Sequence, residues 1–481
     1  MSRTKIVATI GPASSRPETI RRMLHAGMTV ARINFSHGDH ASHAGTVKML
    51  REVAKEEGKV LALLADLQGP KLRIGHVRAG GMQLALGDEV VLTPHPGQPA
   101  MIQLPHPGLI EAMEPGGRLV IGDGEVEFTV AEKKEDTLRC IVTVAGPLGS
   151  RKGISAPGAD VAISSMTPKD RTDLDLIDAL DFDYVALSFV RSAEDVFELR
   201  RLLEAKGCDI PIIAKIEKSE AIEHLEEIRD ASDGMMVARG DLGIDMPAQE
   251  VPLLQKRIIR SCNEVGKPVI TATQMLQSMV EHPRPTRAEA SDVANAILDG
   301  TDAVMLSNET ATGSYPVESV LMMKQIAENI EEAFPYDVWR SRRIDVDAGS
   351  LSVAEAISAA SCSVAEQIVA RVIVATTTSG YSAQQIAKHR PPVPILAVSP
   401  SANTQRRLAL VWGVDCLLVP PFRNTDDMLE ATMAALLPFK IADDDKVVVT
   451  AGVPFGFEGK TNMIQVHSFG DVKLNGKSHG A

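Results

Sequence analysis

The feature of this 481-residue sequence that most constrains its fold is a repeat, through the first two thirds of the chain, of short apolar runs each followed by an amphipathic stretch. Apolar runs of this length are typical of buried strands, and apolar residues every three to four positions are typical of helices. Eight parallel strands alternating with helices predict an α/β fold, the (β/α)8 or TIM barrel. The expected strands span residues 5–10, 30–35, 61–67, 184–189, 212–217, 234–241, 268–273 and 303–309.

One connection interrupts this repeat, because residues 70–153 separate the third expected strand from the helix before the fourth. Their short apolar and alternating stretches, bounded by Gly and Asp turns, are typical of antiparallel strands. We expect an inserted small β-barrel that serves as a lid. Without it, residues 1–69 and 154–345 amount to about 260 residues, close to the ~250 of a typical α/β barrel. After this portion, residues 346–481 resume the alternation of apolar runs and helical patterns, and we expect a separate C-terminal α/β domain.

Composition excludes several classes of protein. Lys and Arg total 50 against 63 Asp and Glu, and the net charge of −13 repels polyanions, so nucleic acid is not an expected partner. No apolar run reaches 18 residues, so we expect no membrane span. The five cysteines are scattered without a CxxC motif, and the first residues lack the apolar segment of a signal peptide. These features predict a cytoplasmic protein.

Candidate functional residues stand where the expected strands end, because the active site of an α/β barrel lies at the carboxyl ends of its strands. Residues two apart on a strand share a face, so paired polar residues there would point in the same direction. Five expected strands end in such groups: Arg32, Asn34 and Ser36; Lys215 and Glu217; Arg239 and Asp241; Thr271 and Thr273; Ser307 and Glu309.

Glu217 and Asp241 are the most informative of these residues. Like charges on neighbouring strands repel each other unless a divalent cation separates them, and carboxylate oxygens suit Mg²⁺ or Mn²⁺. A structural interpretation stays open for Lys215 and Glu217, which could form an ion pair that closes the barrel interior.

Arg32, Lys215 and a divalent cation around one cavity suit phosphoryl transfer, in which catalysis depends on positioning and on stabilising charge. The sequence has neither the GxxxxGK[ST] motif of P-loop enzymes nor a GxGxxG motif after a strand. Arg239 is expected to hold its loop through Glu289 or Asp292 rather than to act in catalysis. A kinase of this kind would use the open end of the barrel, covered by the inserted domain.

Longer motifs show that the sequence resembles the pyruvate kinase family along essentially its whole length. In the family's order they are TKIVATIGPAS at 4–14, VARINFSHG at 30–38, DLQGPKLRIG at 66–75, IIAKIEKSEA at 212–221, VARGDLGIDMP at 237–247, TATQML at 271–276, the segment 283–316, and TTTSGYSA at 376–383. The family moves the phosphoryl group of phosphoenolpyruvate to ADP in the final step of glycolysis, and the resulting enolate is protonated to pyruvate. The resemblance also implies a regulatory C-terminal domain and a homotetramer.

The resemblance implies a role for each residue at the strand ends. Arg32 would contact the substrate phosphoryl group, and Lys215 would stabilise its charge during transfer. Glu217 and Asp241 would hold the Mg²⁺ or Mn²⁺ ion.

The resemblance also implies which residues bind the substrate carboxylate, which bind the nucleotide and which take part in proton transfer. Backbone amides at Gly240 and Asp241, with the Thr273 hydroxyl, would bind the substrate carboxylate, and Thr273 would also lie on the protonation side of the enolate. ADP or ATP would contact Asn34, His37, Arg73 and Lys152. A proton-relay neighbourhood would include Ser188, Ser307 and Glu309.

The C-terminal motif resembles the phosphate loop of the family's allosteric site. The expected effector loop consists of Thr376, Thr377, Thr378, Ser379, Gly380 and Ser382. Tyr381 stands where a basic residue is common, so a monophosphate such as a sugar phosphate or AMP is expected rather than a bisphosphate. An ordinary strand-to-helix turn with capping hydroxyls is the alternative.

Lys71 is a departure from the potassium-dependent members of the family, which carry glutamate at this position. The monovalent cation there is associated with the positions of Asn34, Ser36 and Asp66. Because a tethered ammonium can supply the same positive charge, the sequence predicts that K⁺ is not required. A solvated lysine at the lid hinge is the alternative.

Two other functions would use the same fold. A metal-dependent, enolate-forming lyase or aldolase would use Glu217 and Asp241 without phosphoryl transfer, but it would not need a lid carrying Arg73 and Lys152. A non-catalytic sensor would keep the effector loop, but it would have no reason to retain Lys215 beside two carboxylates.

Overall fold

The computed structural model describes residues 2–77, 81–95, 101–159, 161, 163–344, 351–453 and 461–470. Eight parallel strands close into a barrel, in which β16 pairs with β1. The strands are β1 (Lys5–Thr9), β2 (Val30–Asn34), β3 (Ala62–Asp66), β12 (Tyr184–Leu187), β13 (Ile212–Ile216), β14 (Gly234–Ala238), β15 (Val269–Ala272) and β16 (Ala303–Leu306). The predicted (β/α)8 barrel is therefore confirmed.

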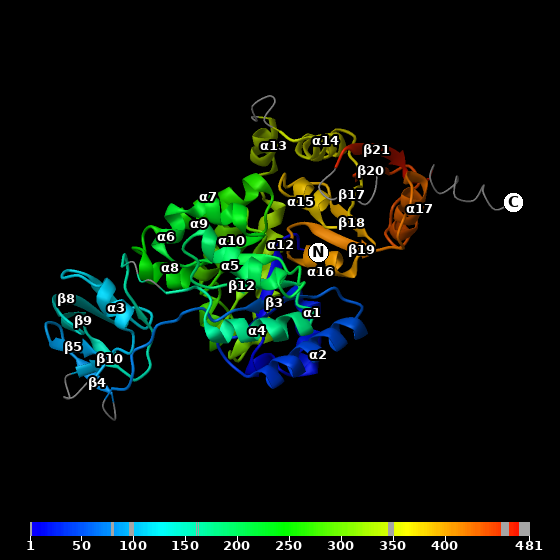
Figure 1. Ribbon diagram of the computed structural model, residues 1–481. Helices are drawn as coiled ribbons and strands as arrows, with labels where there is room; N and C mark the ends of the chain where they lie inside the picture. The colour runs from blue at the N-terminus through cyan, green and yellow to red at the C-terminus, as the bar shows by residue number, and fades with distance from the viewer. Residues whose placement is uncertain are drawn as a thin grey trace.

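Helices cover the outside of this barrel (Figure 1). The helices of this domain, including the short α8 and α11 that follow strand ends, are α1 (Pro17–Ala26), α2 (His40–Glu56), α4 (Pro168–Ala179), α5 (Ala193–Glu204), α6 (Ser219–Glu223), α7 (Leu225–Ala231), α8 (Arg239–Asp245), α9 (Val251–Val265), α10 (Arg287–Asp299), α11 (Asn308–Ala311) and α12 (Pro316–Glu332). Alternate residues of each strand pack into two different apolar cores. On β1, Ile6 and Ala8 pack under the helices, while Val7 belongs to the cluster inside the barrel. Burial on both faces explains why the strands are apolar almost throughout. No helix among the described residues has the length and apolarity to cross a membrane.

All eight strands end one to three residues earlier than the sequence pattern predicts, and the difference is largest for β14 and β16. Arg239 and Asp241 belong to the first turn of α8, and Glu309 lies in α11, so the expected sharing of a strand face is wrong for these pairs. Thr273 follows β15 with a φ of +69°, so Thr271 and Thr273 do not share a strand face either. The polar residues that close these apolar runs start helices or turns instead of extending the strands.

The inserted domain is built from two sheets around one apolar core. A six-stranded sheet has the order β11-β7-β8-β9-β5-β6, and β10 pairs with β4 in the second sheet. The elements are β4 (Met82–Leu84), β5 (Glu89–Thr93), β6 (Met101–Gln103), α3 (Pro107–Ala112), β7 (Arg118–Ile121), β8 (Val126–Lys134), β9 (Thr137–Val144), β10 (Gly146–Leu148) and β11 (Ile154–Ser155). All pairs are antiparallel except β5 with β6. The domain projects from one side of the barrel, in cyan in Figure 1, and we call it the lid.

The C-terminal domain contains a five-stranded sheet of order β19-β18-β17-β20-β21, in which only β21 is antiparallel to its neighbour. Helix α13 (Tyr336–Ile344) precedes this domain. The elements of the domain are α14 (Val353–Gln367), β17 (Val372–Thr376), α15 (Tyr381–Ala387), β18 (Ile395–Ser399), α16 (Ala402–Arg407), β19 (Val414–Leu418), α17 (Thr425–Leu436), β20 (Lys446–Ala451) and β21 (Met463–Ser468). The expected α/β domain is therefore present. Figure 1 shows it across the barrel from the lid.

A buried arginine joins this domain to the barrel. Arg390 is 1% exposed, and its guanidinium donates to Asp302 at 3.2 Å, to the Asn263 side chain at 3.0 Å and to the Gly300 carbonyl at 2.7 Å. The same group lies over the Trp412 ring at 4.7 Å. Since Asp302 directly precedes β16, the C-terminal domain closes the amino-terminal end of the barrel and leaves the opposite end free.

Candidate active site

A cluster of buried charges occupies the carboxyl end of the barrel strands, which we call the mouth. Arg32, on β2, donates to Asp66 at 2.6 Å and to the Thr9 hydroxyl at 2.9 Å. Lys215, on β13, lies 3.3 Å from the other Asp66 oxygen. Burial raises the pKa of Asp66, but Lys215 and Arg32 outweigh it and hold the pKa below its ordinary value. Asp66 therefore remains ionised and positions two cations side by side.

Lys215 connects this group to Glu217 and Ser188. Its ammonium lies 2.9 Å from Glu217 and donates to the Ser188 hydroxyl at 2.7 Å. Burial lowers the pKa of Lys215, but the Asp66 and Glu217 carboxylates outweigh it and raise the pKa above its ordinary value. The lysine is therefore cationic in the folded protein.

Glu217 is 1% exposed and faces a second carboxylate, Asp241. Burial raises the pKa of Glu217, Lys215 opposes this shift, and the nearby Asp241 adds to it. The Phe189 amide donates to one Glu217 oxygen at 2.8 Å, and Lys215 contacts the other. The predicted carboxylate pair is thus brought together, although Asp241 comes from α8 instead of a strand.

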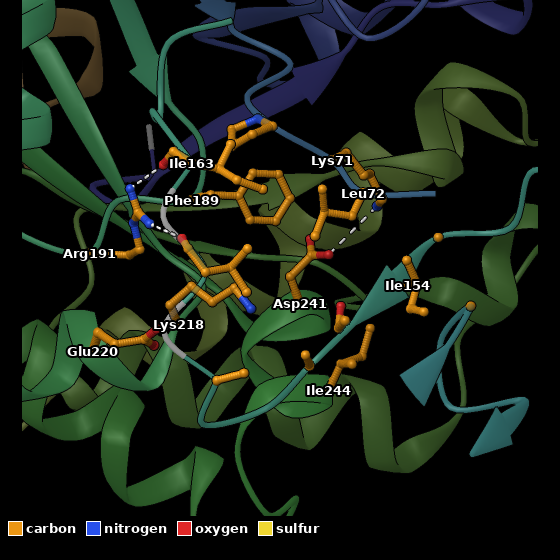
Figure 2. Close-up of a pocket in the computed structure, with 17 residues that line it drawn as sticks. Lys71, Leu72, Ile154, Ile163, Phe189, Arg191, Lys218, Glu220, Asp241 and Ile244 are labelled. Carbon is orange, nitrogen blue, oxygen red and sulfur yellow. Dashed lines mark hydrogen bonds and ion pairs between the residues drawn. The ribbon is translucent and has the colours of Figure 1, made fainter. Parts of the chain in front are cut away.

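Lys71 reaches this pair from the lid hinge. Its ammonium lies 3.6 Å from an Asp241 oxygen, and the dashed line in Figure 2 marks this contact. The side chain is 40% exposed, so the pair is accessible to solvent. Lys71 therefore carries its charge to the Asp241 side of the cluster, whereas Asn34 binds the Ser36 amide at 3.0 Å and Asp66 contacts Arg32 and Lys215.

Thr273 and Gly240 meet beside Asp241. The Gly240 amide donates to the Thr273 hydroxyl at 2.7 Å, and that hydroxyl donates to the Ala272 carbonyl at 2.6 Å. A positive φ is unfavourable for a β-branched residue such as Thr273 and must be held by its surroundings. Arg239 supplies this support, because it donates to the Thr273 carbonyl at 2.7 Å and contacts Asp292 at 2.7 Å.

Arg239 thus holds its loop as expected, through Asp292. Glu289, the other expected partner, instead caps α10 and binds Ser278. Glu309 is wholly buried and accepts the amides of Leu276 and Ser307, so it braces the loops beside the mouth.

The four expected nucleotide residues lie in two places. Arg73 and Lys152 stand on the two chain segments that connect barrel and lid, which a bridge between Arg73 and Gly153 brings side by side. Arg73 donates to the Arg151 carbonyl at 3.1 Å, and Lys152 contacts Glu125 at 2.7 Å. Asn34 is the last residue of β2, and His37 lies exposed in the loop that follows it.

A cavity between the lid and the barrel adjoins this site. Its lining includes Lys71 and Asp241, together with Phe189, Arg191 and Lys218. Figure 2 shows Arg191 turned toward the carbonyl of Ile163, to which it donates, and Lys218 contacts Asp245 at 2.7 Å. Sequence reasoning did not select Arg191 or Lys218. The sequence offered one indication for Lys218, because this residue directly follows Glu217.

The expected effector loop is largely bonded within its own domain. The Thr376 hydroxyl donates to the Thr450 carbonyl at 3.1 Å, the Thr377 hydroxyl accepts the Gly380 amide at 2.9 Å, and the Ser382 hydroxyl lies 2.6 Å from that of Thr461. Gly380, with a φ of +95°, is the N-cap of the seven-residue helix α15. Thr378 is exposed and Ser379 is half-buried.

Comparisons with known proteins agree on one family. Residues 1–320 match the family described as pyruvate kinase, barrel domain, and residues 355–467 match pyruvate kinase, alpha/beta domain. Pyruvate kinase of Geobacillus stearothermophilus is 44% identical over 484 residues, covering 99% of this chain and 82% of that protein. Pyruvate kinase 2 of Synechocystis is 46% identical over 473 residues, covering 96% and 79%.

A solved structure extends this agreement to the fold. Pyruvate kinase from Cryptosporidium parvum has a TM-score of 0.92 and 34% sequence identity, covering 97% of this chain and 96% of that one. The sequence match and the structural match both run through barrel, lid and C-terminal domain. The chain therefore belongs to the pyruvate kinase family and is a phosphotransferase.

Proposed function

We propose that the barrel mouth binds phosphoenolpyruvate and transfers its phosphoryl group to ADP, giving ATP and pyruvate. The observation that carries this proposal is the environment of Lys215, which lies buried between Asp66 and Glu217 while Arg32 binds the same aspartate. An ion pair that merely closed the barrel would need one cation. Two cations held by one carboxylate can instead meet the negative oxygens of a phosphoryl group.

Lys215 and Arg32 would act on the phosphoryl group without rearranging. Arg32 would orient it, and Lys215 would meet the charge that develops on its oxygens during transfer. Asp66 holds both cations before the substrate arrives, so little reorganisation is needed in the transition state.

Glu217 and Asp241 would hold a divalent cation, Mg²⁺ or Mn²⁺. Each Glu217 oxygen accepts one contact from protein and keeps a further lone pair for a metal. No cluster of three or more metal-binding side chains occurs among the described residues, so substrate oxygens and water would complete the coordination, as is common for Mg²⁺. When bound, the cation would polarise the carboxylate and phosphoryl oxygens of the substrate.

Gly240 and Thr273 would bind the substrate carboxylate. Their mutual hydrogen bond places an amide and a hydroxyl at one point beside Asp241, where both could donate to an incoming anion. Thr273 would also lie on the side from which the enolate receives its proton, next to the Ser188, Ser307 and Glu309 neighbourhood.

ADP would lie between the lid hinge and the loop after β2. The residues assigned to ADP are Arg73 and Lys152 on the hinge, Asn34 at the end of β2 and His37 in the loop that follows. Arg73 now contacts a backbone carbonyl and Lys152 an exposed carboxylate. Polyphosphate oxygens can replace both contacts at little cost.

Lys71 would make a bound potassium ion unnecessary. Its ammonium brings a positive charge to Asp241 at the edge of the cluster, instead of occupying the group formed by Asn34, Ser36 and Asp66. The support for this proposal is the sign and the place of the charge, which reaches the substrate site from the hinge.

A phosphorylated effector would bind the loop of residues 376–382. Because the hydroxyls of Thr376, Thr377 and Ser382 already have protein partners, the Thr378 and Ser379 hydroxyls and the loop amides would carry this contact. Family membership also supports a homotetramer and a cytoplasmic location.

The direct test of this function is a coupled assay. Purified protein with phosphoenolpyruvate, ADP and Mg²⁺ should form pyruvate and ATP in equal amounts, and omission of ADP should stop pyruvate formation. Pyruvate release at full rate without ADP would instead favour the enolate-forming lyase or aldolase.

A further inference from the structure

The first turn of α4 contacts both loops that border the mouth. The chain enters this helix directly after it returns from the lid, and Thr167 and Asp170 form a capping box there. The Asp170 side chain is wholly buried. One of its oxygens accepts the Thr167 amide at 2.9 Å and the Thr167 hydroxyl at 2.5 Å.

The other Asp170 oxygen leaves the helix and holds the first segment of the lid hinge. It accepts the Gln68 amide at 3.0 Å and the Gly69 amide at 3.3 Å. These residues lie just after β3 and just before the chain enters the lid. A carboxylate on the chain returning from the lid therefore binds the backbone of the chain leaving for it.

The backbone held by Asp170 leads directly to two groups of the site. Gly69 has a φ of +63°, and a Cβ atom added there would lie 2.9 Å from the Phe189 ring and 3.0 Å from the Ser188 Cβ. Ser188 accepts a hydrogen bond from Lys215. The Lys71 amide donates to the Gly69 carbonyl at 2.9 Å, and the Lys71 side chain then reaches Asp241.

The same helix turn also holds the loop after β2. Lys169 donates to the Phe35 carbonyl at 2.7 Å and contacts the buried Asp173 at 2.6 Å. Asp173 in turn binds His40, the first residue of α2, at 2.7 Å. One turn of α4 thus fixes the backbone on both sides of the position assigned to ADP.

We propose that Asp170 is a positioning residue for lid closure: its carboxylate fixes the hinge at Gln68 and Gly69 and so sets how the lid places Lys71, Arg73 and Lys152 over the mouth. This inference rests on the proposed function. A capping box needs only one oxygen of the carboxylate, and the second oxygen is committed to the hinge. In the described part of the chain, Asp170 forms no ion pair, so four N–H and O–H donors stabilise its buried charge.

The test compares three variants of the full-length protein. Asp170→Ala removes both functions of the carboxylate, Thr167→Ala removes part of the helix cap alone, and Asp170→Asn keeps one oxygen for the hinge amides. Asp170→Ala should lower kcat about tenfold and raise KM for ADP, because small misplacements of reacting groups are costly. Thr167→Ala and Asp170→Asn should stay within about threefold of the parent in kcat.

Two further measurements separate positioning from general damage. Titration with phosphoenolpyruvate and Mg²⁺ should give the same Kd for Asp170→Ala as for the parent, because Asp66 on β3 holds Arg32 and Lys215 in place. Amide hydrogen exchange should become about tenfold faster at Gln68 and Gly69 in this variant and stay unchanged in the barrel strands, as expected for the loss of about 1.4 kcal/mol of hydrogen bonding.

Three results would overturn the proposal. Equal kcat values for Asp170→Ala and Thr167→Ala would show that the residue only caps the helix. A Kd for phosphoenolpyruvate that worsens as much as kcat would show that the whole site is disturbed. Rapid exchange at Gln68 and Gly69 in the parent, which needs no variant to fold, would show that the carboxylate does not hold the hinge. Absence of kinase activity in the parent would instead refute the proposed function.

Discussion

The barrel mouth and the loop after β17 both gather polar residues at the carboxyl ends of parallel strands, but they use those residues differently. At the mouth, Lys215 and Arg32 contact carboxylate side chains whose charges remain available to a ligand. In the C-terminal loop, Thr376 and Thr377 form hydrogen bonds to backbone groups of their own domain. Charges of both signs gathered at the open end of the barrel can act on a ligand, whereas hydroxyls that satisfy the backbone stabilise a turn.

The largest expected effect comes from Lys215→Met at the mouth. The ammonium meets charge that develops in the transition state, so kcat should fall about 10²- to 10³-fold while KM for phosphoenolpyruvate changes little. Steady-state kinetics measure both values. Lys256→Met, which removes a half-exposed lysine of α9 that pairs with Asp299 of α10, is the matched control and should leave kcat unchanged. If kcat of Lys215→Met stayed within a few-fold of the parent, Lys215 would not act in phosphoryl transfer, and the mouth would not differ in this way from the C-terminal loop.

Asp241→Asn tests the carboxylates of the same cluster. Loss of one anionic ligand should raise the Mg²⁺ concentration needed for half-maximal activity about tenfold or more. Glu217→Gln should act in the same direction. The control is Asp245→Asn, because Asp245 is a nearby buried carboxylate that contacts Lys218 outside the mouth. An unchanged Mg²⁺ titration in the Asp241 and Glu217 variants would make these carboxylates structural, like the hydroxyls of the C-terminal loop.

Lys71 extends the comparison to the edge of the mouth. The parent should keep near-full activity without K⁺ or NH₄⁺, and activation by K⁺ should stay below about tenfold, or 1.4 kcal/mol. Lys71→Glu should create a potassium requirement, whereas Lys71→Gln separates the loss of the positive charge from the gain of a negative one. Assays in buffers with tetramethylammonium as the only monovalent cation provide the measurement. Strong K⁺ activation of the parent would refute the role of Lys71.

The smallest effect is expected from Glu355→Gln in the C-terminal domain, which should change stability and leave kcat unaltered. Burial raises the pKa of Glu355, but hydrogen bonds from Lys388 and Ser352 outweigh it and lower the pKa to about 2. Folding lowers the pKa of this carboxylate. Its contribution to stability is therefore present at pH values above the unfolded pKa of 4.5 and is lost as the pH falls toward 2. At pH 7 the free energy of unfolding of the variant should be about 1 kcal/mol lower than that of the parent, as is typical when a helix cap is lost.

Thermal unfolding of parent and Glu355→Gln at pH 7 and pH 3 checks this sign. The difference between their midpoints should shrink at the lower pH. An equal difference at both values would show that the carboxylate charge does not stabilise the domain.

Hydrophobic periodicity was enough to predict the barrel, the insertion and the C-terminal domain, because alternating buried strands and helices leave a strong pattern. It was not enough to predict where each strand ends. Asp241 lies on α8 and yet meets Glu217, since the chain turns after Ala238 and the helix points its first turn at the mouth. A strand-face argument thus placed Glu217 and Asp241 near each other for a partly wrong reason.

Two other features depend on contacts between distant segments and leave no local pattern. Asp170 could be predicted to cap a helix from Thr167 and Pro168, but its hydrogen bonds to Gln68 and Gly69 cross the whole lid insertion. Lys71 could be placed at the hinge, but its partner Asp241 follows only from the closed geometry of the barrel. Family motifs supplied the roles that periodicity could not.

The arginine that joins the C-terminal domain to the barrel limits how the protein can be dissected. A fragment ending before Arg390 would leave Asp302, the Asn263 amide and the Gly300 carbonyl without the cation that they now share. Deleting the domain would also uncover apolar residues at this end of the barrel, which now share a core with Ala409 and Leu410. The isolated barrel should therefore be expressed poorly or aggregate, although it contains every residue assigned to catalysis. The lid is connected through two adjacent hinge segments, and its excision is the route to a smaller soluble fragment.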